Sequence, residues 1–204
     1  MIKGAEVGWG TCTRIISLGS HIWSLSYCNN TIAVGCMKED IIILDAITGS
    51  QITTLSGHLG GVGCLTLSLD GKSLVSGGMR GPINLWDVQT GGITKTFYGH
   101  TGAVWSVCIS ADCTMIVSGS YDHTTRLWDI QTQECLCVIE QQGSVNFVSF
   151  SPTDSQHIIS ISCDEVWHWD INGHQIPPIY DGIHIAFSPD HTQFALCNKR
   201  VVTV

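Results

Sequence analysis

Residues 99–129 read GHTGAVWSVCISADCTMIVSGSYDHTTRLWD, and this stretch decides the fold. Its two anchors recur along the chain at one spacing. Gly57-His58 precedes Gly99-His100 by 42 residues, and Leu85-Trp86-Asp87 precedes Leu127-Trp128-Asp129 by the same distance. Between the anchors lie short runs rich in β-branched residues, bounded by Gly, Asp and Asn, which is typical of strands separated by turns. A fixed period of this length is the signature of a repeat architecture.

Each repeat contains four such runs, so the sequence predicts an all-β chain of four-stranded units. A unit of this kind has two apolar faces that it cannot bury alone, and stacking the units around an axis buries both. We therefore expect a β-propeller as a single domain over residues 1–204. Whole blades are expected near residues 22–56, 62–98, 104–139 and 145–179, with three more strands within 183–204. The repeats run near 19–56, 57–98, 99–140 and 141–180, with a partial one over 181–204.

The Gly-His opening, the Trp-Asp closing and the period resemble the WD-repeat β-propeller family over residues 12–204. The resemblance implies that the N-terminus donates the outer strand of the last blade, and residues 12–18 are expected to form that closing strand. Two alternatives follow for the ring. The chain is a five-bladed propeller closed by this strand, or it is an incomplete part of a seven-bladed ring.

The resemblance also implies a buried hydrogen-bonded tetrad in each complete repeat, made of His, Ser, Asp and Trp. An indole N–H out of water needs an acceptor, which a serine provides, and an imidazole then links the serine to a carboxylate. The third repeat carries all four residues, namely His100, Ser118, Asp122 and Trp128. The second keeps His58, Ser76 and Trp86, with Arg80 in place of the aspartate. The fourth keeps Ser160, Asp164 and Trp169, with Gln141 in place of the histidine. The first repeat is apolar there, with Val34 and Leu44.

Composition excludes several classes of protein. The chain is 44% hydrophobic and 13% charged, which is incompatible with disorder. Its net charge of −8 without a basic cluster argues against binding to nucleic acid or an anionic membrane. None of its ten cysteines forms a C-x-x-C pair, so we expect reduced thiols in the cytoplasm and no metal. No cofactor is expected either.

His100, Ser118 and Asp122 could be mistaken for a catalytic triad. They stand at a repeating structural position, however, and the serine lies in a strand rather than on an exposed turn. The sequence motifs of nucleophile elbows, zinc proteases and phosphate-binding loops are missing. We therefore expect no catalytic residues and no small-molecule substrate.

In the family that the chain resembles, partners commonly meet the top face, built from the loops before the first strand and the turns after the second. The matching positions in this chain are His21, Trp23, Met37, Met79, Trp105, Tyr121, Asn146 and Lys199. Aromatic and methionine side chains are enriched in binding hot spots, although the tryptophans could also be core residues. The expected function is a noncatalytic scaffold that binds a protein or peptide, such as a module of a larger intracellular signalling protein. The alternatives are a hydrolytic or sugar-binding propeller and a reader of modified-lysine peptides.

Overall fold

The computed structural model describes residues 15–37, 40–151, 156–181, 184–187, 194–197 and 202–203. In these ranges the chain consists of strands and turns, and neighbouring strands of each sheet are antiparallel. Blade 1 contains β1 (Ile22–Cys28), β2 (Thr31–Cys36), β3 (Asp40–Asp45) and β4 (Gln51–Ser56). Blade 2 contains β5 (Val62–Leu67), β6 (Ser73–Gly78), β7 (Ile83–Asp87) and β8 (Ile93–Phe97).

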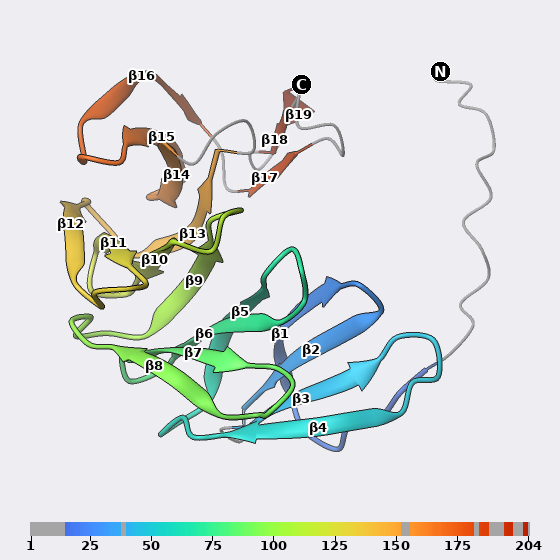
Figure 1. Ribbon diagram of the computed structural model, residues 1–204. Helices are drawn as coiled ribbons and strands as arrows, with labels where there is room; N and C mark the ends of the chain where they lie inside the picture. The colour runs from blue at the N-terminus through green and yellow to red at the C-terminus, as the bar shows by residue number, and fades with distance from the viewer. Residues whose placement is uncertain are drawn as a thin grey trace, which may run out of the picture.

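Blade 3 contains β9 (Val104–Ile109), β10 (Met115–Ser120), β11 (Thr124–Asp129) and β12 (Cys135–Glu140). Blade 4 contains β13 (Val145–Phe150), β14 (His157–Ser162), β15 (Glu165–Asp170) and β16 (Gln175–Asp181). A fifth sheet contains β17 (His184–Phe187), β18 (Phe194–Cys197) and β19 (Val202–Thr203). The sheets follow one another along an arc in sequence order (Figure 1). The blade boundaries predicted from the sequence are confirmed to within two residues.

The aspartate of each Trp-Asp pair stabilises the turn that follows it by accepting a backbone hydrogen bond. The Asp129 carboxylate accepts a hydrogen bond from the backbone N–H of Thr132 at 2.7 Å. Asp87 does the same for Thr90 at 2.6 Å. Such side-chain bonds to the backbone favour turns over continued strand. The recurring aspartate is therefore what ends the third strand and aims the fourth back along it.

Adjacent blades are held together by apolar residues that face one another across the gap between sheets. Val62, Leu65 and Leu67 of β5 pack against Ile41 and Ile43 of blade 1. The same pattern is repeated between blades 2 and 3 and between blades 3 and 4. Ile185 of β17 then packs against the apolar side of blade 4. Because every blade buries both of its faces only through its neighbours, the core is a series of layers between sheets.

Among the described residues, no neighbouring sheet covers the face of blade 1 on which Leu25 and Tyr27 lie. Leu25 and Tyr27 of β1 are both 61% exposed, whereas the equivalent Leu65 and Leu67 of β5 are buried. Only the outer part of this face is covered, where Leu18 packs against Val34 and the other apolar residues that replace the tetrad. The prediction of an apolar tetrad position in the first repeat is confirmed.

The structure does not show a closed ring. Ile15–Leu18 form no strand, and among the described residues the fifth sheet consists of β17, β18 and β19. The expected closing strand over 12–18 is therefore wrong for 15–18, and residues 12–14 lie outside the described ranges. The exposed face of blade 1 also indicates an open ring, because the last blade of a closed ring would cover that face. In the described part of the chain, no helix is long and apolar enough to cross a membrane.

Candidate functional site

The first strand of each blade carries a β-bulge at the same place. The register shifts between Ile22 and Ser24 in β1, between Val62 and Cys64 in β5, and at the matching points of β9 and β13. A bulge inserts one residue without a partner and turns its side chain out of the regular pattern. The residues inserted in the four blades are Trp23, Gly63, Trp105 and Asn146. Blades 1, 3 and 4 thus each redirect one side chain at this level, and blade 2 places Gly63 there.

Backbone hydrogen bonds bring the turn after the second strand to the same edge. The N–H of Met37 donates to the carbonyl of His21 at 3.0 Å. The N–H of Tyr121 donates to the carbonyl of Ala103 at 2.8 Å. An equivalent bond joins Met79 to Gly61 in blade 2 at 3.1 Å. In each of blades 1 to 3, the turn residue after the second strand therefore lies beside the residue two positions before the bulge.

These side chains are largely accessible. Trp23 is 42% exposed, Trp105 37% and Tyr121 62%. Met37, His21 and Asn146 are also exposed, and Met79 is half-buried. The two tryptophans are therefore surface residues rather than core. Lys199 lies outside the described residues. We call the seven described residues the bulge face: His21, Trp23, Met37, Met79, Trp105, Tyr121 and Asn146.

Three further residues, Gly61, Gly63 and His123, shape the bulge face. A Cβ on Gly61 would lie 3.1 Å from the Trp23 ring and 2.8 Å from the Met37 carbonyl oxygen. A Cβ on Gly63 would lie 2.7 Å from the carbonyl oxygen of Val104. Both glycines therefore let neighbouring blades approach closely at this edge. His123 packs edge-on against Tyr121, with ring centroids 6.4 Å apart. This contact depends on the conformation of the turn and could not be inferred from the sequence.

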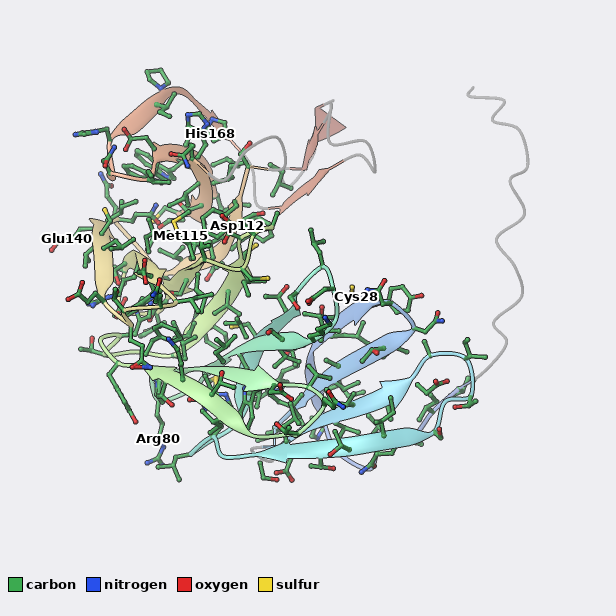
Figure 2. All side chains as sticks on the ribbon, viewed as in Figure 1. Cys28, Arg80, Asp112, Met115, Glu140 and His168 are labelled. Atoms are coloured by element: carbon green, nitrogen blue, oxygen red, sulfur yellow. The ribbon has the colours of Figure 1, made fainter. Side chains whose placement is uncertain are left out.

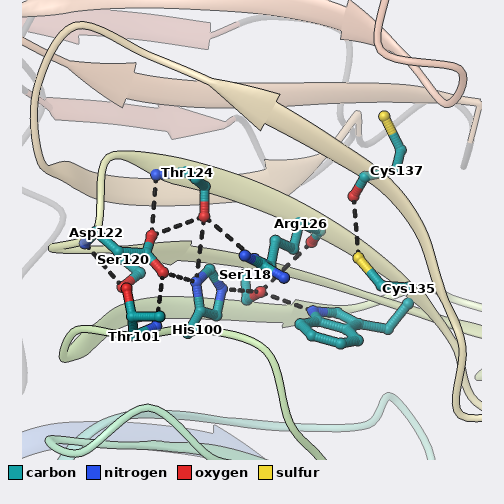
Figure 3. Close-up of polar contacts among 10 residues, drawn as sticks. His100, Thr101, Ser118, Ser120, Asp122, Thr124, Arg126, Cys135 and Cys137 are labelled. Atoms are coloured by element: carbon teal, nitrogen blue, oxygen red, sulfur yellow. Dashed lines mark hydrogen bonds and ion pairs between the residues drawn. The ribbon is translucent and has the colours of Figure 1, made fainter.

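The tetrad of blade 3 is complete and fully connected (Figure 3). The Trp128 indole N–H donates to Ser118 Oγ at 2.8 Å, and Ser118 Oγ lies 2.8 Å from His100 Nε2. His100 Nδ1 lies 2.8 Å from Asp122 Oδ2. A neutral imidazole protonated at Nδ1 satisfies every member, since the serine hydroxyl then donates to Nε2. The structure thus brings together the four residues expected at this position.

The charges of the blade 3 tetrad agree with that proton arrangement. Burial lowers the pKa of His100, against the opposing influence of the Asp122 carboxylate. Burial alone would raise the pKa of Asp122, but hydrogen bonds from Thr124, His100 and the Thr101 backbone outweigh it and lower the pKa to about 2. The network therefore holds a neutral histidine beside an ionised aspartate at neutral pH.

Blade 2 contains only part of this network, as the sequence predicts. His58 Nε2 lies 2.6 Å from Ser76 Oγ, which also accepts from the Trp86 indole at 2.7 Å. His58 Nδ1 is buried and has no hydrogen-bond partner in the structure. Arg80 stands where Asp122 stands in blade 3, and its side chain extends outward at the rim (Figure 2). Burial lowers the pKa of His58 to about 4.

Blade 4 replaces the histidine with an amide. Gln141 Nε2 donates to Ser160 Oγ, which also accepts from the Trp169 indole at 2.9 Å. Gln141 Oε1 is buried without a partner in the structure. Asp164 does not take the backbone position of Asp122. Only Cys163 and Asp164 separate β14 from β15, both at positive φ, whereas three residues separate β10 from β11.

Replacing Arg80 with aspartate is expected to complete the blade 2 tetrad. The new carboxylate would accept from His58 Nδ1 as Asp122 does from His100, so we expect the free energy of unfolding to rise by about 1 kcal/mol. Urea denaturation followed by circular dichroism measures the change. Arg80→Ala is the control, since it removes the guanidinium without adding an acceptor. A gain in the alanine variant equal to that of Arg80→Asp would show that removal of arginine, not the tetrad, is responsible.

Neither Ser118 nor Cys64 is placed to act as a nucleophile. Ser118 is fully buried, and its hydroxyl is already engaged by Trp128 and His100. Burial raises the pKa of the Cys64 thiol to about 12, which leaves it an unreactive thiol at neutral pH. No group of three or more His, Cys, Asp and Glu side chains within the described residues is placed to hold a metal ion.

A comparison with known protein families agrees with this architecture. The family model described as WD40, "WD domain, G-beta repeat", matches residues 49–87 and 91–129. The two matches are consecutive, and they end at Asp87 and Asp129, the aspartates that hold the turns after β7 and β11.

Proposed function

Since this chain belongs to the WD40 repeat family, we propose that it is a noncatalytic scaffold whose bulge face binds a protein or peptide partner. WD40 domains are typically protein-interaction scaffolds, and the finer assignment rests on one observation of this chain. Four equivalent β-bulges redirect one residue per blade to a common edge, where exposed aromatic and methionine side chains gather.

The physical properties of the bulge face suit an adaptable protein interface. Its backbone is held by strand ladders and interblade packing, so little ordering is needed on binding. Tryptophan and tyrosine supply large contact areas and are enriched in hot spots, while methionine adapts to different shapes. The scaffold would work in the cytoplasm as part of signalling, and the eight cysteines whose side chains the structure describes are free thiols, as that compartment favours.

A reader of modified lysines would need several aromatic rings around one ammonium group. Trp23 and Trp105 belong to blades 1 and 3, and blade 2 places Gly63 at the equivalent position between them. This arrangement favours an extended contact along the edge over a single cage. The bulge face thus fits a peptide or loop that crosses several blades.

Peptides selected by phage display against residues 1–204 test this proposal. Tyr121→Ala is expected to weaken binding of the selected peptides by about 30-fold, the loss that a hot-spot residue of about 2 kcal/mol gives. Tyr98→Ala is the matched control, because Tyr98 is an exposed tyrosine outside the bulge face. Trp105→Ala should lower affinity similarly and the free energy of unfolding by less than about 1 kcal/mol. Equal affinity for the two tyrosine variants would contradict the proposal.

A further inference from the structure

A cavity of about 380 Å³ lies where blade 3 passes into blade 4, and no residue of the bulge face lines it. Its lining consists of Glu140, Gln141, Gln142, Trp167, Trp169 and Gln175. Trp167 and Trp169 are stacked, with ring centroids 5.6 Å apart and planes 12° from parallel. Figure 2 shows Glu140 at the outer margin of β12. The volume is at the lower end of the range of about 300–1,000 Å³ for small-ligand sites.

In blades 2 and 3, a side chain of the same blade fills the space beside the tetrad tryptophan. In blade 3 the Arg126 guanidinium carbon lies 5.9 Å from the centre of the Trp128 ring. A Cβ on Gly99 would lie only 2.6 Å from a guanidinium nitrogen of Arg126 and 2.9 Å from Trp128. The guanidinium is therefore enclosed between the glycine and the indole. Cation–π attraction favours this placement, because an aromatic face is negative.

In blade 2 the equivalent space contains a hydrocarbon group. A Cβ on Gly57 would lie 2.8 Å from the Ile93 side chain and 3.2 Å from Trp86. Blades 2 and 3 thus share one construction, with a glycine immediately before the histidine and a side chain enclosed between that glycine and the tryptophan. The enclosed group comes from the same blade in both cases.

Blade 4 keeps the tryptophan of this construction as Trp169 and changes the residues around it. The residue before the histidine position is Glu140 instead of glycine, and Trp167 replaces Arg126 in the register of the third strand. Gln175 pairs with Trp169 as Ile93 pairs with Trp86. The blade has therefore lost its internal guanidinium and gained a carboxylate at the mouth of the space. Two polar atoms at its lining, Gln141 Oε1 and Trp167 Nε1, are buried without partners in the structure.

We propose that this cavity binds the side chain of an arginine supplied by a partner peptide. A guanidinium offers five N–H donors in a plane, which match a carboxylate together with amide oxygens and stack well on indole. Glu140 accepts from it as a charged partner, and the amide oxygen of Gln141 is an acceptor that is otherwise unpaired. The Trp167–Trp169 pair supplies the aromatic wall. Blade 4 would thus take from a partner the group that blade 3 supplies from its own β11.

The charge of the chain favours the same ligand. Its net charge is −8, so a cationic peptide is attracted at long range. A neutral ligand such as a sugar would gain from the tryptophans and amides but not from the Glu140 carboxylate. Lysine would gain from the carboxylate but lacks the planar donors. Among these ligands, arginine alone combines a positive charge for Glu140, planar donors for the Gln141 amide oxygen and a flat face for the tryptophans.

Isothermal titration of residues 1–204 with three blocked tripeptides tests the proposal. The tripeptides are acetyl-Gly-X-Gly-amide with arginine, lysine or citrulline at X. Citrulline keeps the shape of arginine and removes its charge. We expect the arginine peptide to bind best and the citrulline peptide to be the weakest. Equal binding of arginine and citrulline would overturn the proposal, as would equal binding of arginine and lysine, or no binding of the arginine peptide.

Two variants locate the binding. Glu140→Gln is expected to weaken the arginine peptide by about fivefold, the effect of losing one exposed charge pair. Glu134→Gln is the matched control, since Glu134 is an exposed glutamate on the same blade and outside the cavity lining. Trp167→Arg should abolish binding, because the new side chain would occupy the cavity as Arg126 does in blade 3. Unchanged affinity in both Glu140→Gln and Trp167→Arg would place the arginine elsewhere and contradict the assignment.

Discussion

Replacing Ser118 with alanine is expected to lower the free energy of unfolding by about 2–4 kcal/mol. Ser118 Oγ accepts from the Trp128 indole and bonds to His100 Nε2, each at 2.8 Å. Alanine leaves both groups buried without a partner, and an unpaired buried polar group costs about 1–3 kcal/mol. Equilibrium denaturation in urea measures the loss.

Ser144→Ala is the control for this prediction. Ser144 lies before β13 and bonds to the side chain of Asn146 at 3.3 Å. Its replacement should change the free energy of unfolding by less than about 0.5 kcal/mol, as is usual for surface positions. A loss in Ser118→Ala no larger than in Ser144→Ala would mean that the tetrad contributes nothing to stability.

The second large effect is a loss of stability in mild acid, caused by His58. Its pKa is about 4 in the folded protein and about 6.5 in the unfolded chain. The unfolded state therefore binds the proton first, so this contribution is complete above about pH 6.5 and is lost as the pH falls toward 4. Near pH 4.5 the loss is on the order of 2 kcal/mol. Chemical denaturation at a series of pH values between 7 and 4.5 measures it.

His58→Gln isolates the histidine in that experiment. Gln141 already takes the equivalent place in blade 4, where its amide donates to Ser160. The glutamine variant keeps a donor for Ser76 but has nothing to titrate, so its stability should decline less over this pH range. Parallel curves for the two proteins would show that His58 is not responsible for the acid sensitivity.

The fold was predictable because the repeat is strict. The anchors at His58, Trp86, His100 and Trp128 fixed the blade boundaries to within two residues. The tetrad of blade 3 was expected from the family resemblance, and its indole, serine, imidazole and carboxylate can satisfy one another's hydrogen bonds. The positions of Trp23 and Trp105 at bulges were not predictable, because a bulge depends on the pairing of two strands and leaves no local signal.

Two features of blade 4 also needed the structure. The turn between β14 and β15 contains two residues where its counterpart in blade 3 contains three, so the backbone conformation of Asp164 could not be inferred from sequence spacing. The stacking of Trp167 on Trp169 depends on residues two apart in one strand having both rings inclined the same way. Closure of the ring through residues 12–18 was one of the two alternatives left open from family resemblance, and Leu18 packs on blade 1, where Ile15–Leu18 form no strand.

We propose that partners bind the bulge face. Hydrogen exchange of residues 1–204, with and without a peptide selected by display, tests it most directly. When the peptide is bound, we expect slowed exchange at the bulges of β1, β5 and β9 and in the turns that contain Met37, Met79 and Tyr121. Protection confined to the outer strands β4, β8 and β12, with the bulges unchanged, would contradict it.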